Sequence, residues 1–363
     1  MFIFLFILVA GLVLIYANVS PVAPGKKGKL IALGILVSIF LGMFFRDTLF
    51  GCAVVAFTSV WLCQALLFYI PWDLFRGVRR IVVRRAMQPK TLMFASRILL
   101  AATIALTLAL FAYGVPHNGD YKLLETSVNS SKSSFTAVFF SDVHVDPLFK
   151  RAKLERMIAD VDSVKPDYLL FGGDLADVSM EQLDEWGYDS LFRKLTSKAK
   201  VAAVAINGNH EGMQEGSGMT PGEWMRKVGF VVLDDSSACI GEACFTGRTD
   251  FQVARRRGVE RVPLANLVPR DSERTWILMD HQPKGIEPEY SGRLPEYALS
   301  GHTHNGQFFP GTIVIKFVWR LAYGEGVLDG VRWLVSAGVD CWGPPVRVGS
   351  DADMWVVRFT LDK

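Results

Sequence analysis

Five short polar clusters contain most of the histidines in this chain, together with Asp, Glu and Asn side chains that could bind a metal ion. Together they hold three Asp, one Glu, two Asn and five of the six His. The clusters are Ser141-Asp142-Val143-His144, Gly172-Gly173-Asp174, Asn207-Gly208-Asn209-His210-Glu211, Asp280-His281-Gln282-Pro283 and Gly301-His302-Thr303-His304. Imidazole and carboxylate ligands together suit Mn, Fe, Zn or Co better than Ca or Mg, which prefer oxygen ligands alone. The clusters therefore predict a site for a transition metal.

Each cluster follows a short apolar run that is typical of a β-strand. The runs are residues 136–140, 168–171, 201–206, 276–279 and 297–300. They alternate with helical stretches, which predicts an α/β domain. Ligands in such domains gather at the carboxyl ends of strands, so we expect the clusters to meet there. One Asp-x-His motif occurs by chance in many chains, and a lone buried His is more often structural, but neither explains five clusters at five strand ends.

The number of ligands suffices for two ions. Two neighbouring ions need several protein ligands and at least one group that bridges them. A carboxylate can bridge, and Asp174 is the candidate because it stands alone in its cluster. The sequence therefore favours a dinuclear site centred on Asp174.

The order of the clusters resembles the signature of the calcineurin-like metallophosphoesterase superfamily. That signature reads Asp-x-His, Gly-Asp, Gly-Asn-His-Asp/Glu, His and Gly-His-x-His, and all five blocks are present between about Phe135 and Lys363. Residues 301–307 and 342–347, with the apolar first third of the chain, make it similar to the membrane-associated, YkuE-like branch. Asn305 replaces the usual Gly of that branch. Asp280 replaces a small polar residue and could hydrogen-bond an active-site histidine.

The resemblance implies a fold of two facing mixed β-sheets flanked by helices, the metallophosphatase α/β-β/α sandwich. It also implies two divalent ions, Mn first, with Fe, Zn or Co as alternatives. One ion would be bound by Asp142, His144, Asp174 and His304. The other would be bound by Asp174, Asn209, His281 and His302. His210 is left without a metal and would face the phosphate.

The chemistry implied is hydrolysis of a phosphate ester. Two ions about 3.5–4 Å apart lower the pKa of a bridging water and clamp the phosphoryl oxygens, so that a bridging hydroxide attacks phosphorus. His210 would stabilise the developing charge or protonate the leaving group, and Glu211 would orient it.

Two further groups of residues have open interpretations. Arg255, Arg256 and Arg257 could bind a substrate phosphate or anionic lipid headgroups, although a solvated charged loop is the default. Cys239 and Cys244 flank a possible hairpin turn whose Gly241 suits type II′. They could form a disulfide in an oxidising compartment or remain free thiols.

Four stretches in the first third are free of Lys and Arg. Three of them are long enough to span a membrane, and the shorter second one is flanked by Lys29 and Arg46, whose side chains can reach the membrane surfaces. A hydrocarbon core of about 30 Å needs about 20 apolar residues. We expect transmembrane helices at about 2–20, 30–46, 48–71 and 98–116, within an anchor at 1–118. Residues 119–134 would be a linker and 135–363 the catalytic domain. A bundle of soluble helices would show polar stripes, and a cleaved signal peptide would have a basic start, so both are less favoured.

Charge orients the predicted anchor. Residues 1–116 contain eleven Lys or Arg and two Asp or Glu, a net of +9, whereas the remaining 247 residues have a net of −6. The cations lie mostly after the first span and between the third and fourth, so the positive-inside rule predicts an exofacial catalytic domain. Residues 72–85 would be an interfacial helix or a solvated loop. The spans hold no charged residue, which disfavours a transporter.

We therefore expect a metallophosphoesterase that is anchored in the plasma membrane or the bacterial inner membrane. We expect its activities to include hydrolysis of phosphodiesters. Its partners would be the membrane and a phosphorylated lipid or cell-envelope substrate. The acidic domain without a recognition module argues against nucleic acid. Two alternatives remain at this point. One is a UDP-2,3-diacylglucosamine-type pyrophosphate hydrolase, which needs a cytoplasmic site. The other is a non-catalytic metal-binding membrane receptor.

Overall fold

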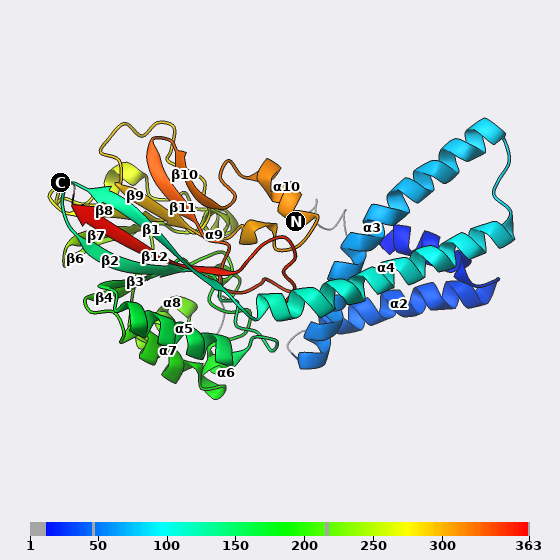
Figure 1. Ribbon diagram of the computed structural model, residues 1–363, viewed down its shortest axis with the longest axis horizontal. Coiled ribbons are helices and arrows are strands. Elements are labelled where there is room, and N and C mark those ends of the chain that lie inside the picture. The colour runs from blue at the N-terminus through cyan, green and yellow to red at the C-terminus, as the bar shows by residue number, and fades with distance from the viewer. Residues whose placement is uncertain (1–11, 46–47, 215–217, 362–363) are drawn as a thin grey trace. The chain divides into compact units, whose positions relative to one another are not determined.

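The protein divides into a helical unit and a unit built around two β-sheets (Figure 1). The computed structural model describes residues 12–45, 48–214 and 218–361. The first unit ends at Val115 and the second begins at Pro116.

Three helices of the first unit are long and apolar enough to cross a membrane. They are α2 (Lys26–Phe44), α3 (Leu49–Val83) and α4 (Pro89–Asn118). Their outer surfaces expose large apolar side chains such as Phe44, 81% exposed, and Phe50, 72% exposed. Water would not favour such surfaces, but hydrocarbon does. These helices support the prediction that the protein is located in a membrane.

The first predicted span falls largely on residues 1–11, which lie outside the described residues. The described part is a short apolar helix at Leu12–Val22, which ends in the 3₁₀ turn η1 (Ser20–Val22). That span therefore stays a prediction.

Helix α3 is longer than predicted. It was expected to end near residue 71, but it continues through Pro71 to Val83, and α4 begins at Pro89 rather than near residue 98. The extension mixes apolar and charged residues, and its Asp73 accepts hydrogen bonds from Asn18 (2.8 Å) and Arg76 (2.9 Å). A proline inside a helix removes one backbone hydrogen bond but is tolerated where neighbouring groups compensate. Residues 72–83 are thus helical rather than a loop.

The first sheet of the second unit has the strand order β1-β12-β2-β3-β4-β5. Strands β2 to β5 are mutually parallel, β12 is antiparallel to β2, and β1 runs parallel to β12. The strands are β1 (Lys122–Ser130), β2 (Phe135–Phe140), β3 (Tyr168–Phe171), β4 (Ala202–Ile206), β5 (Phe230–Leu233) and β12 (Asp353–Leu361).

The second sheet has the order β10-β11-β9-β8-β7-β6. Its central strands β11, β9, β8 and β7 are parallel, and a hairpin partner closes each edge. The strands are β6 (Ser236–Ile240), β7 (Ala243–Gly247), β8 (Thr275–Met279), β9 (Tyr297–Ser300), β10 (Gly324–Leu328) and β11 (Val331–Val335). The two mixed sheets confirm the predicted fold class.

Alternating strand residues build two cores on the first sheet. Phe139 and Leu170 point between the sheets and pack with Phe245 of the second sheet. Their neighbours Val138 and Phe140 point to the other face, which the helices cover. This alternation is the two-residue period of a strand buried on both faces. The covering helices are α5 (Arg151–Val164), α6 (Met180–Glu185), α7 (Tyr188–Thr196) and α8 (Pro221–Lys227).

The remaining helical pieces belong to connections around the second sheet and the strand ends. They are η2 (Glu211–Met213), α9 (Phe251–Arg257), η3 (Leu264–Asn266), η4 (His304–Gly306) and α10 (Gly311–Val318). The outer face of the second sheet buries Trp276 and Trp333 against η3 and neighbouring loops.

Strand β1 occupies most of the segment that was expected to be a linker. It pairs with β12 over nine residues, from Lys122 opposite Asp353 to Ser130 opposite Leu361. Its alternate residues Thr126, Val128 and Ser130 are buried. Only residues 119–121 separate α4 from this strand.

The hairpin of β6 and β7 carries a disulfide. Cys239 and Cys244 lie opposite each other and are bonded, so the structure has the disulfide rather than the free thiols, a choice that the sequence left open. Gly241 has a positive φ of 55°, as the first central residue of a type II′ turn requires.

Candidate metal centre

Strands of both sheets bring their carboxyl ends to one place, and the predicted ligands meet there. Three groups have ligand atoms within 4.8 Å of one another; one joins Asp177 to His144 and His210, and the other two consist of predicted ligands alone. The first group is Asp142, His144 and His304. The second group is Asp174, His281 and His302. These two groups match the two ligand sets implied by the family resemblance, with two differences. Asn209 is not in the second group, and Asp174 is in the second group only.

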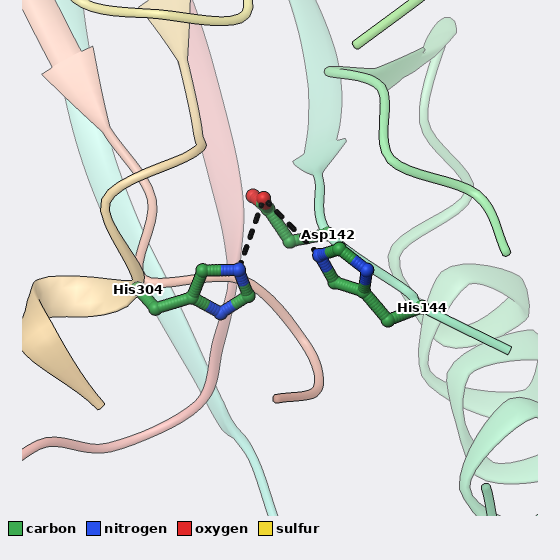
Figure 2. A group of neighbouring side chains, drawn as sticks. All are labelled: Asp142, His144 and His304. Atoms are coloured by element: carbon green, nitrogen blue, oxygen red, sulfur yellow. Dashed lines mark ion pairs between the residues drawn. The ribbon is translucent and has the colours of Figure 1, made fainter. Parts of the chain in front are cut away.

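In the first group, the carboxylate of Asp142 lies between two imidazoles (Figure 2). Its Oδ1 is 3.4 Å from Nε2 of His304 and 3.9 Å from Nε2 of His144. All three residues are buried. Such separations leave room for a cation that contacts all three side chains.

In the second group, one oxygen of Asp174 faces histidines of both groups. Its Oδ2 is 3.1 Å from Nε2 of His281 and 3.6 Å from Nε2 of His144. The His302 ring lies 5.2 Å from the His281 ring. A carboxylate in this position is suited to bridging two ions.

The Nδ1 atom of each of three histidines is held from outside the centre. His281 Nδ1 lies 2.8 Å from the Gly172 carbonyl, and His304 Nδ1 lies 3.2 Å from the Asp340 carbonyl. His144 Nδ1 lies 3.4 Å from the Asp177 carboxylate. Histidines that bind metals commonly use one nitrogen in this way to fix the ring, which leaves Nε2 for the metal.

Buried polar atoms without a partner in the described structure lie at this centre. They are His144 Nε2, His281 Nε2 and Asn209 Oδ1. Leaving a buried polar atom without a hydrogen bond costs about 1–3 kcal/mol, so native proteins rarely do so without a reason. Divalent ions would satisfy all three atoms, and the residues present therefore fit a two-metal site.

The four candidate histidines differ in pKa: despite their burial, nearby carboxylates, Asp177 for His144 and Asp174 for His281, raise the pKa of these two imidazoles well above the usual range. Burial lowers the pKa of His304 to about 3 and that of His302 to about 4, so both imidazoles are neutral near pH 7. Burial would raise the pKa of Asp142, but His304 and His144 hold it below its usual range. Neutral imidazole and ionised carboxylate are the forms that bind metals.

The backbone is unusual at the same positions. Five candidate ligands have a positive φ: Asp142 (56°), His144 (44°), Asp174 (60°), His302 (70°) and His304 (48°). Residues with a side chain adopt this region rarely, and such strain clusters at functional sites. Glycines permit the close packing, because a Cβ on Gly208 would lie 2.2 Å from Oδ1 of Asp174.

Asp177 is a site residue that the sequence analysis missed. Its Oδ1 lies 2.5 Å from Nδ1 of His210 and 3.4 Å from Nδ1 of His144. An isolated parallel bridge between Val145 and Ala176 extends β2 and β3 and brings Asp177 beside the first cluster. The sequence feature that could have identified Asp177 is its position, three residues after the predicted ligand Asp174.

Glu211 does not orient His210, contrary to expectation. Its buried carboxylate accepts hydrogen bonds from the backbone N–H groups of Leu175 (2.6 Å), Gly208 (2.7 Å) and Asp174 (3.1 Å). Burial and the nearby Asp174 raise the pKa of Glu211 to about 6. Three amides close together attract a carboxylate more strongly than one imidazole does, so Glu211 ties the two ligand loops together.

Asp280 pairs with an arginine rather than a histidine, and the three arginines of α9 lie outside the ligand groups. Asp280 Oδ2 pairs with Nη2 of Arg261 at 2.6 Å, and the described structure gives it no histidine partner. Arg255, Arg256 and Arg257 are exposed in the last turn of α9. Arg256 donates to the carbonyl of Gly212, near but outside the ligand groups.

The C-terminal loop supports the first group through Arg347, whose side chain is fully buried. Its guanidinium donates to five carbonyl oxygens, those of His304, Ala337, Gly338, Asp340 and Asp351. The same loop places the exposed Trp342 with its ring 6.0 Å from that of His210.

Comparison with known proteins agrees with this geometry. The family model described as calcineurin-like phosphoesterase matches residues 135–306, which hold every candidate ligand. The second unit is therefore similar to calcineurin-like phosphoesterases.

Relatives of the domain occur in bacteria and animals. An uncharacterized metallophosphoesterase of Helicobacter pylori is 26% identical over 242 residues, covering 66% of this chain and 64% of the relative. The uncharacterized metallophosphoesterase YkuE of Bacillus subtilis is 28% identical over 270 residues, covering 69% and 89%. A transmembrane protein with metallophosphoesterase domain from Danio rerio is 24% identical over 365 residues, covering 93% and 82%. The chain thus spans a little under two thirds of the length of the Helicobacter relative.

Proposed function

We propose that this protein is a membrane-anchored phosphoesterase that hydrolyses a phosphate ester with two divalent ions. The observation that carries the proposal is the position of Asp174, whose Oδ2 lies within 3.6 Å of Nε2 of both His144 and His281. A structural carboxylate would have no need of two inward-pointing imidazoles whose Nε2 atoms lack any other partner.

Seven residues would hold the ions, with manganese as the first candidate. Asp142, His144, Asp174 and His304 would bind one ion. Asp174, Asn209, His281 and His302 would bind the other. When bound, the ions supply positive charge for the phosphoryl oxygens and lower the pKa of water, which is then the nucleophile.

His210 is the residue we assign to the substrate. Its Nδ1 is held by Asp177, and its side chain is 12% exposed, so Nε2 is available to a bound phosphate. From there it would stabilise charge on a phosphoryl oxygen or donate a proton to the leaving oxygen. Asp177 would fix the ring and stabilise the imidazolium, as the carboxylate does in other acid–base pairs.

We further propose that the domain is exofacial and acts on a lipid or cell-envelope phosphate. The Lys and Arg residues next to the membrane spans favour this orientation. The Cys239–Cys244 disulfide supports it, because disulfides persist in oxidising compartments. Only residues 119–121 separate α4 from β1, and so short a connection to the anchor favours membrane-borne substrates.

Turnover of bis-p-nitrophenyl phosphate tests the activity. The full-length protein, treated with a chelator and reconstituted in nanodiscs, is expected to hydrolyse this diester after addition of Mn, Zn or Co. Asp162→Asn changes an exposed carboxylate on α5 and serves as the matched control, with unchanged turnover expected. No turnover with any of the three metals would reject the proposal in favour of a non-catalytic metal-binding receptor.

A reporter enzyme fused after Lys363 tests the orientation. An alkaline phosphatase reporter, active only outside the cytoplasm, is expected to be active. Activity of a cytoplasmic reporter alone would contradict the exofacial placement and revive the lipid-precursor pyrophosphate hydrolase.

A further inference from the structure

Helix α10 (Gly311–Val318) exposes an apolar surface beside the metal centre. None of its eight residues is buried, although five of them are Ile, Val or Phe. Phe317 is 86% exposed, Val318 63%, Val314 54% and Ile313 52%. Single exposed apolar side chains are common on soluble domains, but a contiguous group of this kind marks a surface that meets another apolar phase.

The pattern of α10 is that of a helix lying in a membrane interface. Ile313, Val314 and Phe317 are spaced i, i+1 and i+4, so they share one face of the helix. Residues 308–320 contain four aromatic side chains and the cations Lys316 and Arg320, but no Asp or Glu. Aromatic rings and cations around an apolar face favour the boundary between lipid headgroups and acyl chains.

The point where the last membrane span ends lies near this helix. Asn118, the final residue of α4, donates to Oδ1 of Asp340 at 2.6 Å. The carbonyl of Asp340 lies 3.2 Å from Nδ1 of His304, which begins η4. η4 packs against α10, and a Cβ on Gly306 would lie 2.2 Å from the carbonyl oxygen of Gly311. Three short contacts within the second unit therefore connect Asn118, at the end of α4, to α10.

The other end of α10 reaches the second group of ligands. Trp319, which caps the helix, packs its ring 5.4 Å from that of His302. Lys284 lies over the ring of Trp319, with its Nζ 4.9 Å from the ring centre. One end of α10 therefore contacts η4, which begins at the candidate ligand His304, and the residue at its other end contacts the candidate ligand His302.

We propose that α10 inserts its apolar face into the lipid bilayer and holds the mouth of the metal centre at the membrane surface. The partner is the bilayer itself, because the exposed face continues from a chain that is already anchored in lipid and its flanking charges match anionic headgroups. This inference rests on the proposed function, because docking of α10 would serve hydrolysis only if the substrate is a lipid phosphate. A phosphate at headgroup depth could then reach the ions without leaving the bilayer.

Photocrosslinking of the full-length protein tests the docking. Phe317 is replaced by p-benzoylphenylalanine, and the protein is reconstituted in nanodiscs of phosphatidylcholine and phosphatidylglycerol with alkyne-tagged acyl chains. The control carries the same residue in place of Val201, which is 46% exposed and precedes β4, at the end of the strand opposite Asn209. We expect lipid labelling at position 317 to exceed that at position 201 about tenfold.

Equal labelling at the two positions would overturn the proposal. A crosslinked dimer in place of lipid labelling would also overturn it and identify a second copy of the chain as the occupant.

A second variant separates docking from activity. Val314→Ser is expected to reduce lipid labelling at position 317 several-fold, while turnover of bis-p-nitrophenyl phosphate stays within about twofold of that of the parent chain. Labelling that is unaffected by Val314→Ser would contradict insertion of this face. Labelling without turnover would reject the phosphoesterase function and leave the docking intact, whereas turnover without labelling would reject the docking alone.

Discussion

The two halves of the metal centre are supported in different ways. In the first half, Asp177 holds His144, and Asp340 holds His304 while its own carboxylate pairs with Lys153 at 2.9 Å. Asp340 and Lys153 are buried, Asp177 is partly exposed, and the three supports come from distant parts of the chain. In the second half, a backbone carbonyl holds His281, and the partly exposed His302 meets the ring of Trp319.

This difference suggests that the ligands of the first half are held more rigidly and that the second half is more accessible to a substrate. A largely buried network of charged side chains fixes the ligands of the first half, so we expect its ion to bind more tightly. The second half has fewer charged supports and lies beside α10, so it is the half that a substrate can approach. The following predictions test this division, from the largest expected effect to the smallest.

Asp174→Ala should disable both halves, because it removes the one carboxylate that faces both groups of histidines. We expect kcat to fall by about 10³-fold or more and both ions to be lost or weakened, since the ions supply most of the catalytic charge. Elemental analysis of the purified protein measures the metal content beside the turnover assay. Full activity in this variant would remove the basis for a shared carboxylate.

His210→Ala should leave both halves loaded and still impair the reaction. Loss of a general acid or a charge-stabilising group typically lowers kcat by about 10²–10⁴-fold. Two ions per chain are expected in elemental analysis, as in the unmodified protein. Loss of an ion would instead place His210 among the ligands.

Asp177→Asn should affect the first half alone. The amide cannot stabilise the imidazole as a carboxylate does, and changes of such supporting groups cost about 10–100-fold in metal affinity or activity. Titration of the metal-free protein with Mn should show one weakened site and one unchanged site. Equal weakening of both sites would contradict the separation into two halves.

Trp319→Ala tests the second half and should have a smaller effect. The variant removes a ring contact with His302 that is worth about 0.5–1.5 kcal/mol, so we expect turnover to fall by about two- to tenfold. Metal content should stay at two ions per chain. A loss comparable to that of Asp177→Asn would show that the second half depends as strongly on its supports.

Asp353 gives a pH-dependent test of the loop behind the first half. Burial raises the pKa of this carboxyl from 3.8 to about 6, so its contribution to stability is present below pH 3.8 and is lost as the pH rises through 6. Between pH 5 and pH 7 the loss is about 1 kcal/mol. Asp353→Asn should lack this change, so its melting temperature relative to the parent chain should rise by about 2–4 °C over that interval. A constant difference would show that Asp353 does not titrate there.

The ligands could be predicted from the sequence because each lies directly after a strand, where local pattern determines position. Their supports could not be predicted in the same way. The groups that hold His281 and His304 are backbone carbonyls, which every residue possesses. Asp177 comes close to His210 only through the pairing of neighbouring strand ends.

The errors in the fold have a similar origin. Strand β1 has only a weak alternation of its own, and it forms because β12, more than two hundred residues later, offers a parallel partner. Helix α3 passes Pro71 although proline usually marks a boundary, and Asp73 in its extension accepts a hydrogen bond from Asn18 of another helix. Contacts between distant segments decided both cases, and a local pattern contains no information about them.

The positive φ of five candidate ligands has a consequence for how this domain would change in evolution. A side chain in this backbone region costs roughly 1 kcal/mol relative to glycine, and only the chemistry of the side chain compensates for that cost. A descendant released from selection for catalysis would therefore gain stability by acquiring Gly or Asn at positions such as His302 or His144. Retention of Asp and His at all five strained positions is accordingly what selection for a working metal centre would leave in this chain.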